Sequence, residues 1–150
     1  MLEFDKHGFL TPYDAISSDF ETLESSFLFN QQRANLYLEL LTLLKDFKEK
    51  DIRFVKIWIN GSFISKKILP NDIDIVFFVD FSVYLQNEDY FSMLYRNRKN
   101  IDCQFISVYP ENHKKHFLYI SDTVEYRHNF SRNWKSTLKQ HKGFLEILSS

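Results

Sequence analysis

Residues 57–80 read Ile-Trp-Ile-Asn-Gly-Ser-Phe-Ile-Ser-Lys-Lys-Ile-Leu-Pro-Asn-Asp-Ile-Asp-Ile-Val-Phe-Phe-Val-Asp, and this stretch decides the expected fold. An apolar run ends at Gly61-Ser62, a polar loop follows, and a second apolar run begins at Ile73. The pattern predicts a strand, a tight turn and another strand. Glycine lets the backbone approach a phosphate closely, and the N–H and hydroxyl of Ser62 are further donors. The turn is therefore a candidate phosphate-binding element.

Two carboxylates, Asp72 and Asp74, stand at the start of the second apolar run. Side chains alternate along a strand, so both project from one face, roughly 6–7 Å apart along the backbone. Like charges on an otherwise apolar strand are costly unless something offsets their repulsion, and Mg²⁺ prefers carboxylate oxygens together with phosphates and water. The pair therefore predicts a Mg²⁺ (or Mn²⁺) site. Asp72 follows Pro70-Asn71, so an ordinary turn residue is the alternative interpretation of that position.

Together, Gly61, Ser62, Asp72 and Asp74 resemble the signature of the DNA polymerase β-like nucleotidyltransferase superfamily. In that signature a Gly-Ser pair after a strand precedes an Asp-x-Asp on the next strand. The resemblance implies a metal-bound nucleoside triphosphate, such as ATP, as the substrate. It also implies transfer of a nucleotidyl group with release of pyrophosphate.

The superfamily places a third acid on the following strand, between hydrophobic residues, and Asp102 in Ile-Asp-Cys is the residue that fits. The resemblance implies that Asp72 and Asp74 bridge two ions. Asp102 would bind the ion that activates the attacking hydroxyl and would accept the proton of that hydroxyl. The alternative for Asp102 is an exposed residue at the start of a strand.

The same resemblance also implies which residues bind the phosphates. Ser62 with the Gly61 turn would hold the β- and γ-phosphates, and Lys66 or Lys67 would neutralise them as a point charge. The alternative for Lys66-Lys67 is an exposed pair in a loop.

Composition bounds the class of protein. A chain of 150 residues with 44% hydrophobic residues and 16 Phe fits one compact domain, residues 1–150, with a genuine core. The formal net charge of −1 supplies no global basic field for a long nucleic acid. A single cysteine, Cys103, excludes an internal disulfide framework. No apolar stretch approaches the roughly 20 residues that span a bilayer, and the N-terminus lacks signal-peptide features. We therefore expect a soluble, cytoplasmic protein without membrane association.

Hydrophobic periodicity predicts the elements. Residues 1–17 are expected to be irregular. The predicted elements are a short helix from Asp19, a helix over about 30–50, strands over 53–59, 73–79 and 101–108, a helix over about 88–98, one or two helices between about 113 and 140, and an edge strand over 144–148. This order is typical of a small α/β (α+β) domain with a mixed β-sheet and helices packed against it. It also matches the minimal polymerase β-like nucleotidyltransferase core.

Nearly the whole chain resembles a narrower group, short bacterial nucleotidyltransferase-like proteins classed as a domain of unknown function. The matching pieces are His7-Gly8-Phe9-Leu10, Arg33 in the long helix, Gly61-Ser62-Phe63 with Lys67, Pro70-Asn71-Asp72-Ile73-Asp74, and Lys142-Gly143. Small members of the superfamily act in toxin–antitoxin or phage-defence pairs, and some nucleotidylate a partner protein or a tRNA end. The resemblance therefore implies a protein or RNA acceptor and a cognate toxin or antitoxin partner.

Two other classes of function stay open. One is a non-catalytic binding module, such as an antitoxin or regulatory subunit that kept the fold. The other is a toxin that needs its partner, which an exposed aromatic patch around Tyr84, Tyr90 or Tyr119 would favour.

Several further residues have two interpretations. His113-Lys114-Lys115-His116 is either a metal or phosphate patch or a solvated helix face, and Cys103 is a core residue rather than a nucleophile. The C-terminal third is either an RNA acceptor surface, with bases stacking on rings, or ordinary core and solvated charge. Its residues are Arg127, His128, Arg132, Lys135, Lys139 and Lys142, with Tyr126, Phe130 and Trp134 interleaved.

Overall fold

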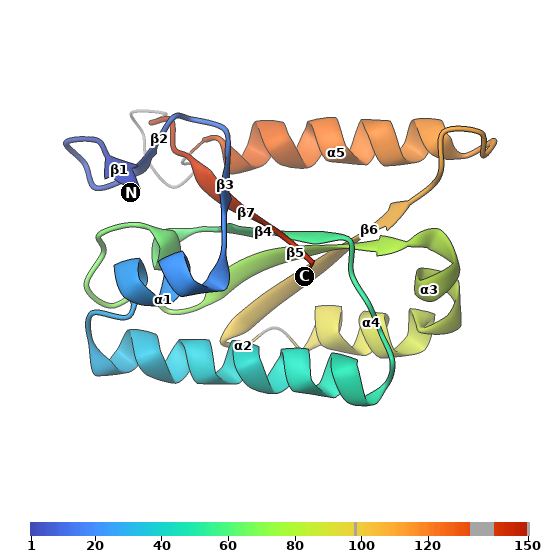
Figure 1. Cartoon of the computed structure of the whole chain (residues 1–150), viewed down its shortest axis with the longest axis horizontal. Helices are drawn as coiled ribbons and strands as arrows, with labels where there is room; N and C mark the ends of the chain where they lie inside the picture. Colours follow the sequence, from blue (N-terminus) through green and yellow to red (C-terminus); the bar gives the residue numbers. More distant parts are fainter. Residues whose placement is uncertain (98, 133–139, 150) are drawn as a thin grey trace.

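The computed structural model describes residues 1–97, 99–132 and 140–149. Figure 1 shows the chain as a layered α/β structure. Its elements are β1 (Glu3–Phe4), β2 (Leu10–Thr11), β3 (Ala15–Ser18), α1 (Phe20–Phe27), α2 (Gln31–Glu49), β4 (Lys56–Asn60), the 3-10 turn η1 (Ser62–Ile64), β5 (Ile73–Asp80), α3 (Phe81–Gln86), α4 (Glu88–Arg96), β6 (Ile101–Val108), α5 (His116–Phe130) and β7 (Phe144–Leu148). The predicted fold class, a small mixed sheet with helices packed against it, is confirmed.

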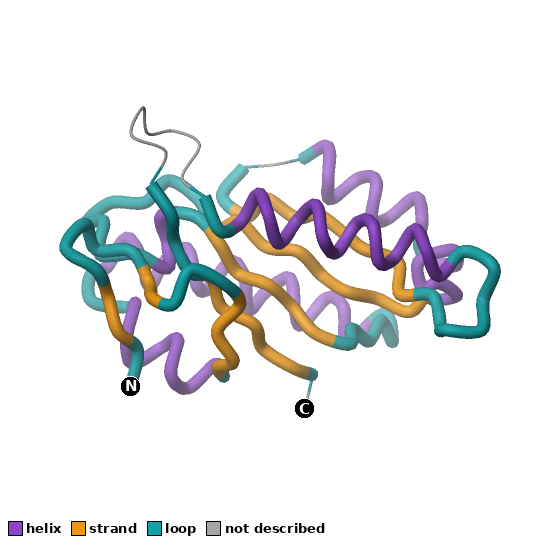
Figure 2. Tube along the Cα trace, turned by 90° about the horizontal axis from the view of Figure 1, so that it is seen from above, coloured by secondary structure: helices purple, strands orange, loops and turns teal. Residues whose placement is uncertain are grey.

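One mixed sheet organises the chain, with the strand order β3-β7-β4-β5-β6. β5 and β6 run parallel, as do β3 and β7, whereas β4 is antiparallel to both of its neighbours. The helix α5 covers one face of the sheet, and α2 and α4 cover the other (Figures 1 and 2). β1 and β2 form a separate two-stranded sheet.

The core lies on both faces of β5. All residues of this strand from Ile73 to Val79 except Asp74 are buried, as predicted for a central strand covered on both sides. From the α2 side, Phe47 packs against Phe77 with ring centroids 4.8 Å apart. From the α5 side, the ring of Tyr119 packs 6.5 Å from that of Phe78. Burying one such side chain contributes about 1.5–3 kcal/mol, so β5 is anchored independently from two layers.

α1 and α2 both start after a side-chain N-cap. The Asp19 carboxylate accepts a hydrogen bond from the Thr22 N–H, and the Asn30 side chain accepts one from the Arg33 N–H. α2 and α4 occupy their predicted ranges to within two residues. α5 lies inside the predicted 113–140 stretch, of which residues 133–139 are outside the described residues.

The described elements differ from the prediction at four places. Residues 1–17 are not irregular, because β1 and β2 pair and β3 joins the main sheet beside β7. β7 is not an edge strand, because it lies between β3 and β4. The helix α3 was not predicted at all. It starts directly after its N-cap residue, Asp80, whose carboxylate accepts a hydrogen bond from the Ser82 N–H. β4 also starts at Lys56 rather than Arg53.

No helix in the described ranges is long and apolar enough to cross a membrane.

Candidate active site

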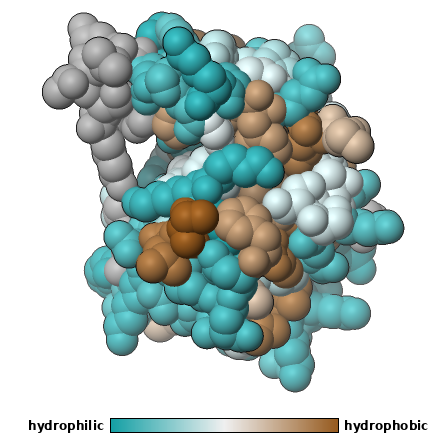
Figure 3. All heavy atoms as spheres, turned by 90° about the vertical axis from the view of Figure 1, so that its left-hand side faces the viewer, coloured by the Kyte–Doolittle hydropathy of each residue, from teal (hydrophilic) through white to brown (hydrophobic). Residues whose placement is uncertain are grey.

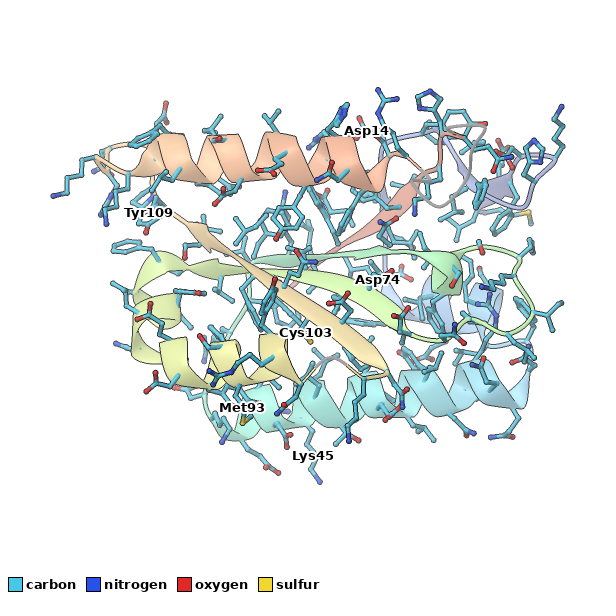
Figure 4. All side chains as sticks on the ribbon, turned by 180° about the vertical axis from the view of Figure 1, so that it is seen from behind. Asp14, Lys45, Asp74, Met93, Cys103 and Tyr109 are labelled. Carbon is cyan, nitrogen blue, oxygen red and sulfur yellow. The ribbon has the colours of Figure 1, made fainter. Side chains whose placement is uncertain are left out.

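A cleft of about 580 Å³, lined by both polar and apolar residues, opens on the α5 side of the sheet. All the sequence-predicted site residues except Asp72 line it, namely Gly61, Ser62, Lys66, Lys67, Asp74 and Asp102. Figure 4 shows Asp74 between the sheet and α5, with Cys103 on the opposite side of the sheet. The structure therefore gathers residues that are up to 41 positions apart in the chain, from Gly61 to Asp102.

Asp74 and Asp102 lie side by side. They are register partners on the parallel strands β5 and β6, and each is the second residue of its strand. Neighbouring strands are about 4.8 Å apart, and register partners point to the same face. The spacing and strand assignment of these two acids, predicted from the sequence, therefore bring both carboxylates to one wall of the cleft.

Gly61 packs directly against the carboxylate of Asp74. A Cβ built on Gly61 would lie only 2.2 Å from Asp74 Oδ2, and the φ of Gly61 is +83°. Both the contact and the left-handed backbone require glycine. The Gly-Ser turn and the Asp-x-Asp thus form one structural unit.

Asn60 is a site residue that the sequence interpretation missed. It ends β4, is the register partner of Asp74, and lines the cleft with only 7% of its surface exposed. Its Oδ1 atom is buried and accepts no hydrogen bond from the described part of the chain. An unsatisfied buried amide oxygen costs free energy unless a ligand completes it. A polar residue closing an apolar strand directly before Gly-Ser was the signal that could have identified it.

These oxygen donors fit a bound Mg²⁺ ion. Mg²⁺ usually binds proteins through one or two carboxylates and completes its shell with substrate phosphates and water. Asp74, Asp102 and the Asn60 amide oxygen are such a set, and the buried Asn60 oxygen is the structural observation that supports the fit.

Asp72 stands apart from this set. It precedes β5, is half-buried, and is not among the residues lining the cleft. Among residues 1–97, 99–132 and 140–149, no group of three or more His, Cys, Asp or Glu side chains could hold a metal ion. Two of the three predicted carboxylates therefore come together, and a bridging role for Asp72 stays a prediction.

Positive charge surrounds the two carboxylates. Lys66 and Lys67 come from the exposed loop after η1, and Arg132 and Lys142 come from the segments that follow α5 and precede β7. The Lys66 ammonium lies 4.2 Å from the centroid of the Phe4 ring, which holds it beside the N-terminal hairpin. A cleft with more cations than carboxylates attracts a polyanion such as a triphosphate.

The N-terminal turn forms another wall that the sequence interpretation missed. The Asp5 carboxylate accepts hydrogen bonds from the N–H groups of His7 and Phe9, and the Lys66 N–H donates to the Gly8 carbonyl at 3.0 Å. This places His7 and Phe9 against the loop, where both line the cleft. The end of the molecule that carries this turn and the loop has a mixed surface, with hydrophobic side chains near its centre and hydrophilic ones around them (Figure 3), and Ile68 and Leu69 of the loop are exposed.

The basic C-terminal third divides between core, surface and cleft. Tyr126 donates its hydroxyl proton to Gln104, Phe130 is buried, and Arg127 pairs with Asp14 at 3.1 Å. Of the named cations that the structure describes, Arg132 and Lys142 line the cleft, while His128 is exposed. Trp134, Lys135 and Lys139 lie outside the described residues, so the RNA-surface interpretation of those positions stays a prediction.

The remaining candidates do not belong to the cleft. Burial, and then the nearby Asp102 charge, raises the pKa of Cys103 to about 12, which fits its interpretation as a core residue. His116 Nδ1 contacts the Tyr109 carbonyl and His113 Nδ1 accepts from the Lys115 N–H, so both histidines organise the turn before α5. Tyr84, Tyr90 and Tyr119 are half-buried, whereas Phe117, Leu118 and Ile120 beside Tyr119 are exposed.

Comparison with known proteins identifies the family but assigns no activity. No curated protein and no solved structure matches the chain. One family model matches residues 2–148, nearly the full length. The chain therefore belongs to DUF6932, a family of unknown function.

Proposed function

We propose that this protein is a metal-dependent nucleotidyltransferase that moves a nucleoside monophosphate from a nucleoside triphosphate to a hydroxyl of a protein or RNA acceptor. One observation carries the proposal. The Asp74 carboxylate is packed against the Gly61 turn and lies in register with Asp102, in a cleft whose other charged groups are mainly cations. This combination suits a substrate that brings both phosphate charge and a bound divalent ion.

Each cleft residue has a role in this chemistry. Lys66 and Lys67 bind the β- and γ-phosphates, and the Ser62 hydroxyl donates a hydrogen bond to them. Asp74, Asp102 and the Asn60 amide oxygen would hold Mg²⁺, which would neutralise phosphate charge and lower the pKa of the acceptor hydroxyl.

The reaction itself is an in-line displacement. The acceptor oxygen forms a bond to the α-phosphorus while the bond from that phosphorus to the α,β-bridging oxygen breaks, and pyrophosphate leaves. The acceptor proton passes to the Asp102 carboxylate, which lies on the cleft wall with Asp74.

A transfer assay tests this proposal. Each of the four nucleoside triphosphates, labelled at the α-phosphate, is supplied with Mg²⁺ or Mn²⁺, and total RNA and lysate protein are offered as acceptors. Label should move to one acceptor class with the wild type and not with Asp74→Asn or Asp102→Asn. Absence of both label transfer and Mg²⁺-dependent triphosphate binding would contradict the proposal.

A second candidate function is a nucleotide-binding module without catalysis. It is favoured by the position of Asp72 outside the cleft lining, because two-metal centres normally use more than two carboxylates. Mg²⁺-dependent binding of a triphosphate with no transfer to any acceptor, in the presence of a cognate toxin or antitoxin partner as well as in its absence, would select this alternative.

A further inference from the structure

A buried arginine lies directly behind the candidate phosphate loop. Arg33, in the first turn of α2, has 0% of its surface exposed. Its guanidinium donates to five backbone carbonyls, and four of them belong to the loop that follows Gly61. The acceptors are the carbonyl oxygens of Phe27, Ser62, Phe63, Ser65 and Lys67. The planar fork of arginine, with its five N–H donors, suits such convergent acceptors.

The surroundings of Arg33 fix the guanidinium in one position. Its Cζ lies 4.3 Å from the ring centroid of Phe29 and 5.4 Å from that of Phe63, so two rings flank it. Burial lowers the pKa of Arg33 to about 10, which leaves the group charged at neutral pH. A buried charge is tolerated only when its donors are satisfied, and here the loop carbonyls satisfy them.

Neighbouring side chains of the same helix start hold the rest of the loop. Asn30 Nδ2 donates to the Ile68 carbonyl at 2.7 Å, and Gln32 Nε2 donates to the Pro70 carbonyl. Three residues at the start of α2 therefore bind the backbone of the loop from Ser62 to Pro70. None of the three lines the cleft.

This arrangement sets the direction of the loop dipoles. In a trans peptide the N–H points opposite to the C=O of the same unit. Carbonyls directed at Arg33 therefore direct the amides of Phe63, Ile64, Lys66 and Ile68 away from it. Two of these amides are bonded within the protein, because the Ile64 N–H donates to the Gly61 carbonyl and the Lys66 N–H to the Gly8 carbonyl. The loop lines the cleft with Ser62, Ser65, Lys66 and Lys67, and Arg33 holds their backbone from behind.

We propose that Arg33 is the positioning residue of the phosphate site. It does not touch the ligand, but it holds residues 62–67 in the conformation that receives the β- and γ-phosphates. The identity of the ligand rests on the proposed function; the positioning of the loop does not.

The first experiment compares Arg33→Lys with Tyr37→Phe. Lysine keeps the charge, but its single ammonium cannot satisfy the same set of carbonyls. Tyr37, on the same helix, donates its hydroxyl proton to Glu24 at 2.6 Å, and that hydroxyl does not contact the loop. Tyr37→Phe therefore removes an internal hydrogen bond of α2 without touching the loop, and it serves as the control. The probe is inorganic triphosphate with Mg²⁺, titrated by calorimetry. Arg33→Lys should lower the affinity about tenfold or more, and Tyr37→Phe should leave it unchanged. Equal affinities in wild type and Arg33→Lys would overturn the inference.

A double-mutant cycle separates positioning from general destabilisation. If Arg33 acts through the loop, the effects of Arg33→Lys and Ser62→Ala on triphosphate affinity are strongly non-additive, because both act on the same contacts. Additive effects would contradict a positioning role. Should Arg33→Lys fail to fold by circular dichroism, Gln32→Ala replaces it, and a few-fold loss of affinity is expected. An unchanged affinity in Gln32→Ala would then overturn the inference.

Hydrogen exchange distinguishes the two proposals from each other. Amides of residues 62–68 should exchange faster in Arg33→Lys than in the wild type, without any ligand. If the wild type binds no triphosphate, the proposed function fails, and faster exchange would still support positioning of the loop by Arg33. Equal exchange in both proteins would refute that positioning whatever the ligand.

Discussion

At the residue scale, Gly61 is the position where the fold and the candidate site meet most closely. Gly61→Ala should lose about 1–2 kcal/mol of stability from its positive φ. Its new methyl group also meets Asp74 Oδ2, so the carboxylate must move and nucleotide transfer should disappear. Gly8→Ala is the control for backbone strain, because Gly8 has the same φ of +83° but its Cβ would lie 2.9 Å from Lys66 Cβ and not against a carboxylate. Urea unfolding should give a stability loss for Gly61→Ala at least as large as for Gly8→Ala, and transfer assays should show that Gly8→Ala retains more activity than Gly61→Ala. Loss of activity in both variants alike would refute the special role of Gly61.

Cys103 gives a prediction from its raised pKa. Burial keeps the thiol protonated far above neutral pH, so iodoacetamide should modify native Cys103 very slowly at about pH 8 and the unfolded chain quickly. A thiol whose pKa is higher in the folded than in the unfolded state contributes stability at neutral pH that is lost as the pH rises from about 9 towards about 12. Cys103→Ser should remove that part of the alkaline loss. Rapid native modification at about pH 8 would contradict the burial argument.

Most residues of the candidate site could be predicted from the sequence, but the residues that hold its loop in place could not. Gly61, Ser62 and Asp74 could be predicted because glycine and a carboxylate beside apolar strands are unusual locally, whereas Asp102 followed from the resemblance to the superfamily. The role of Arg33 could not be derived, because its partners are backbone carbonyls about 30 residues away, and any residue type supplies a carbonyl. Asn60 was overlooked because its orphaned oxygen is visible only once β4 and β5 are paired.

At the element scale, a half-buried polar cluster joins β7 to β4 in the middle of the sheet. Glu146 accepts a hydrogen bond from Trp58 Nε1 at 2.9 Å and pairs with Lys56 at 2.9 Å. Burial alone would raise the pKa of Glu146, but the Trp58 hydrogen bond and then Lys56 outweigh burial and lower it. The cluster therefore adds a hydrogen bond and an ion pair to the hydrophobic contacts between β7 and β4.

This cluster predicts an acid-dependent stability. A carboxyl whose pKa is lowered by folding contributes stability that is present above its unfolded value of about 4.5 and is lost as the pH falls through the folded value. Glu146→Gln should flatten that acid loss while keeping an acceptor for Trp58. Glu146→Ala should cost about 1–3 kcal/mol at neutral pH, because Trp58 Nε1 loses its partner. Urea unfolding between about pH 7 and pH 3.5 measures both effects. An identical acid loss in wild type and Glu146→Gln would contradict the assignment.

The longer helices and strands were predicted correctly, but the short elements and the order of the strands in the sheet were not. The long periodic helix α2 and the apolar β5 carry their own signals in consecutive residues. β3 has only four residues, two of them serine, and β7 reads as any short apolar run. Their positions depend on each other, because β3 pairs with β7 and β7 with β4. More than 120 residues of sequence separate β3 from β7, so no local sequence pattern predicts their pairing. The sequence therefore predicted β7 as an edge strand.

At the scale of the whole molecule, charge is distributed unevenly. The formal net charge is −1, yet Lys66, Lys67, Arg132 and Lys142 gather around the cleft. The pair Lys114-Lys115 lies in the exposed turn before α5, at the end of the molecule opposite the loop that carries Lys66-Lys67 (Figure 1). The chain thus contains two adjacent lysine pairs of equal charge, one in the cleft and one far from it.

The two pairs allow a test of local against global electrostatics. Lys66→Ala/Lys67→Ala and Lys114→Ala/Lys115→Ala each remove two positive charges, so the net charge changes equally. If the cleft binds phosphate groups, the first variant should lose about tenfold or more in affinity for Mg²⁺-triphosphate, and the second should stay close to the wild type.

The dependence on salt should differ in the same way. Raising NaCl from about 0.05 to about 0.5 M shortens the screening length severalfold and should weaken binding by the wild type and by Lys114→Ala/Lys115→Ala in parallel. The slope should be shallower in Lys66→Ala/Lys67→Ala, because fewer charges remain near the ligand to be screened. Parallel slopes in all three proteins would mean that the loop lysines do not face the phosphates. In that case Arg132 and Lys142, on the far side of the cleft, would be the cations that determine where the phosphates bind.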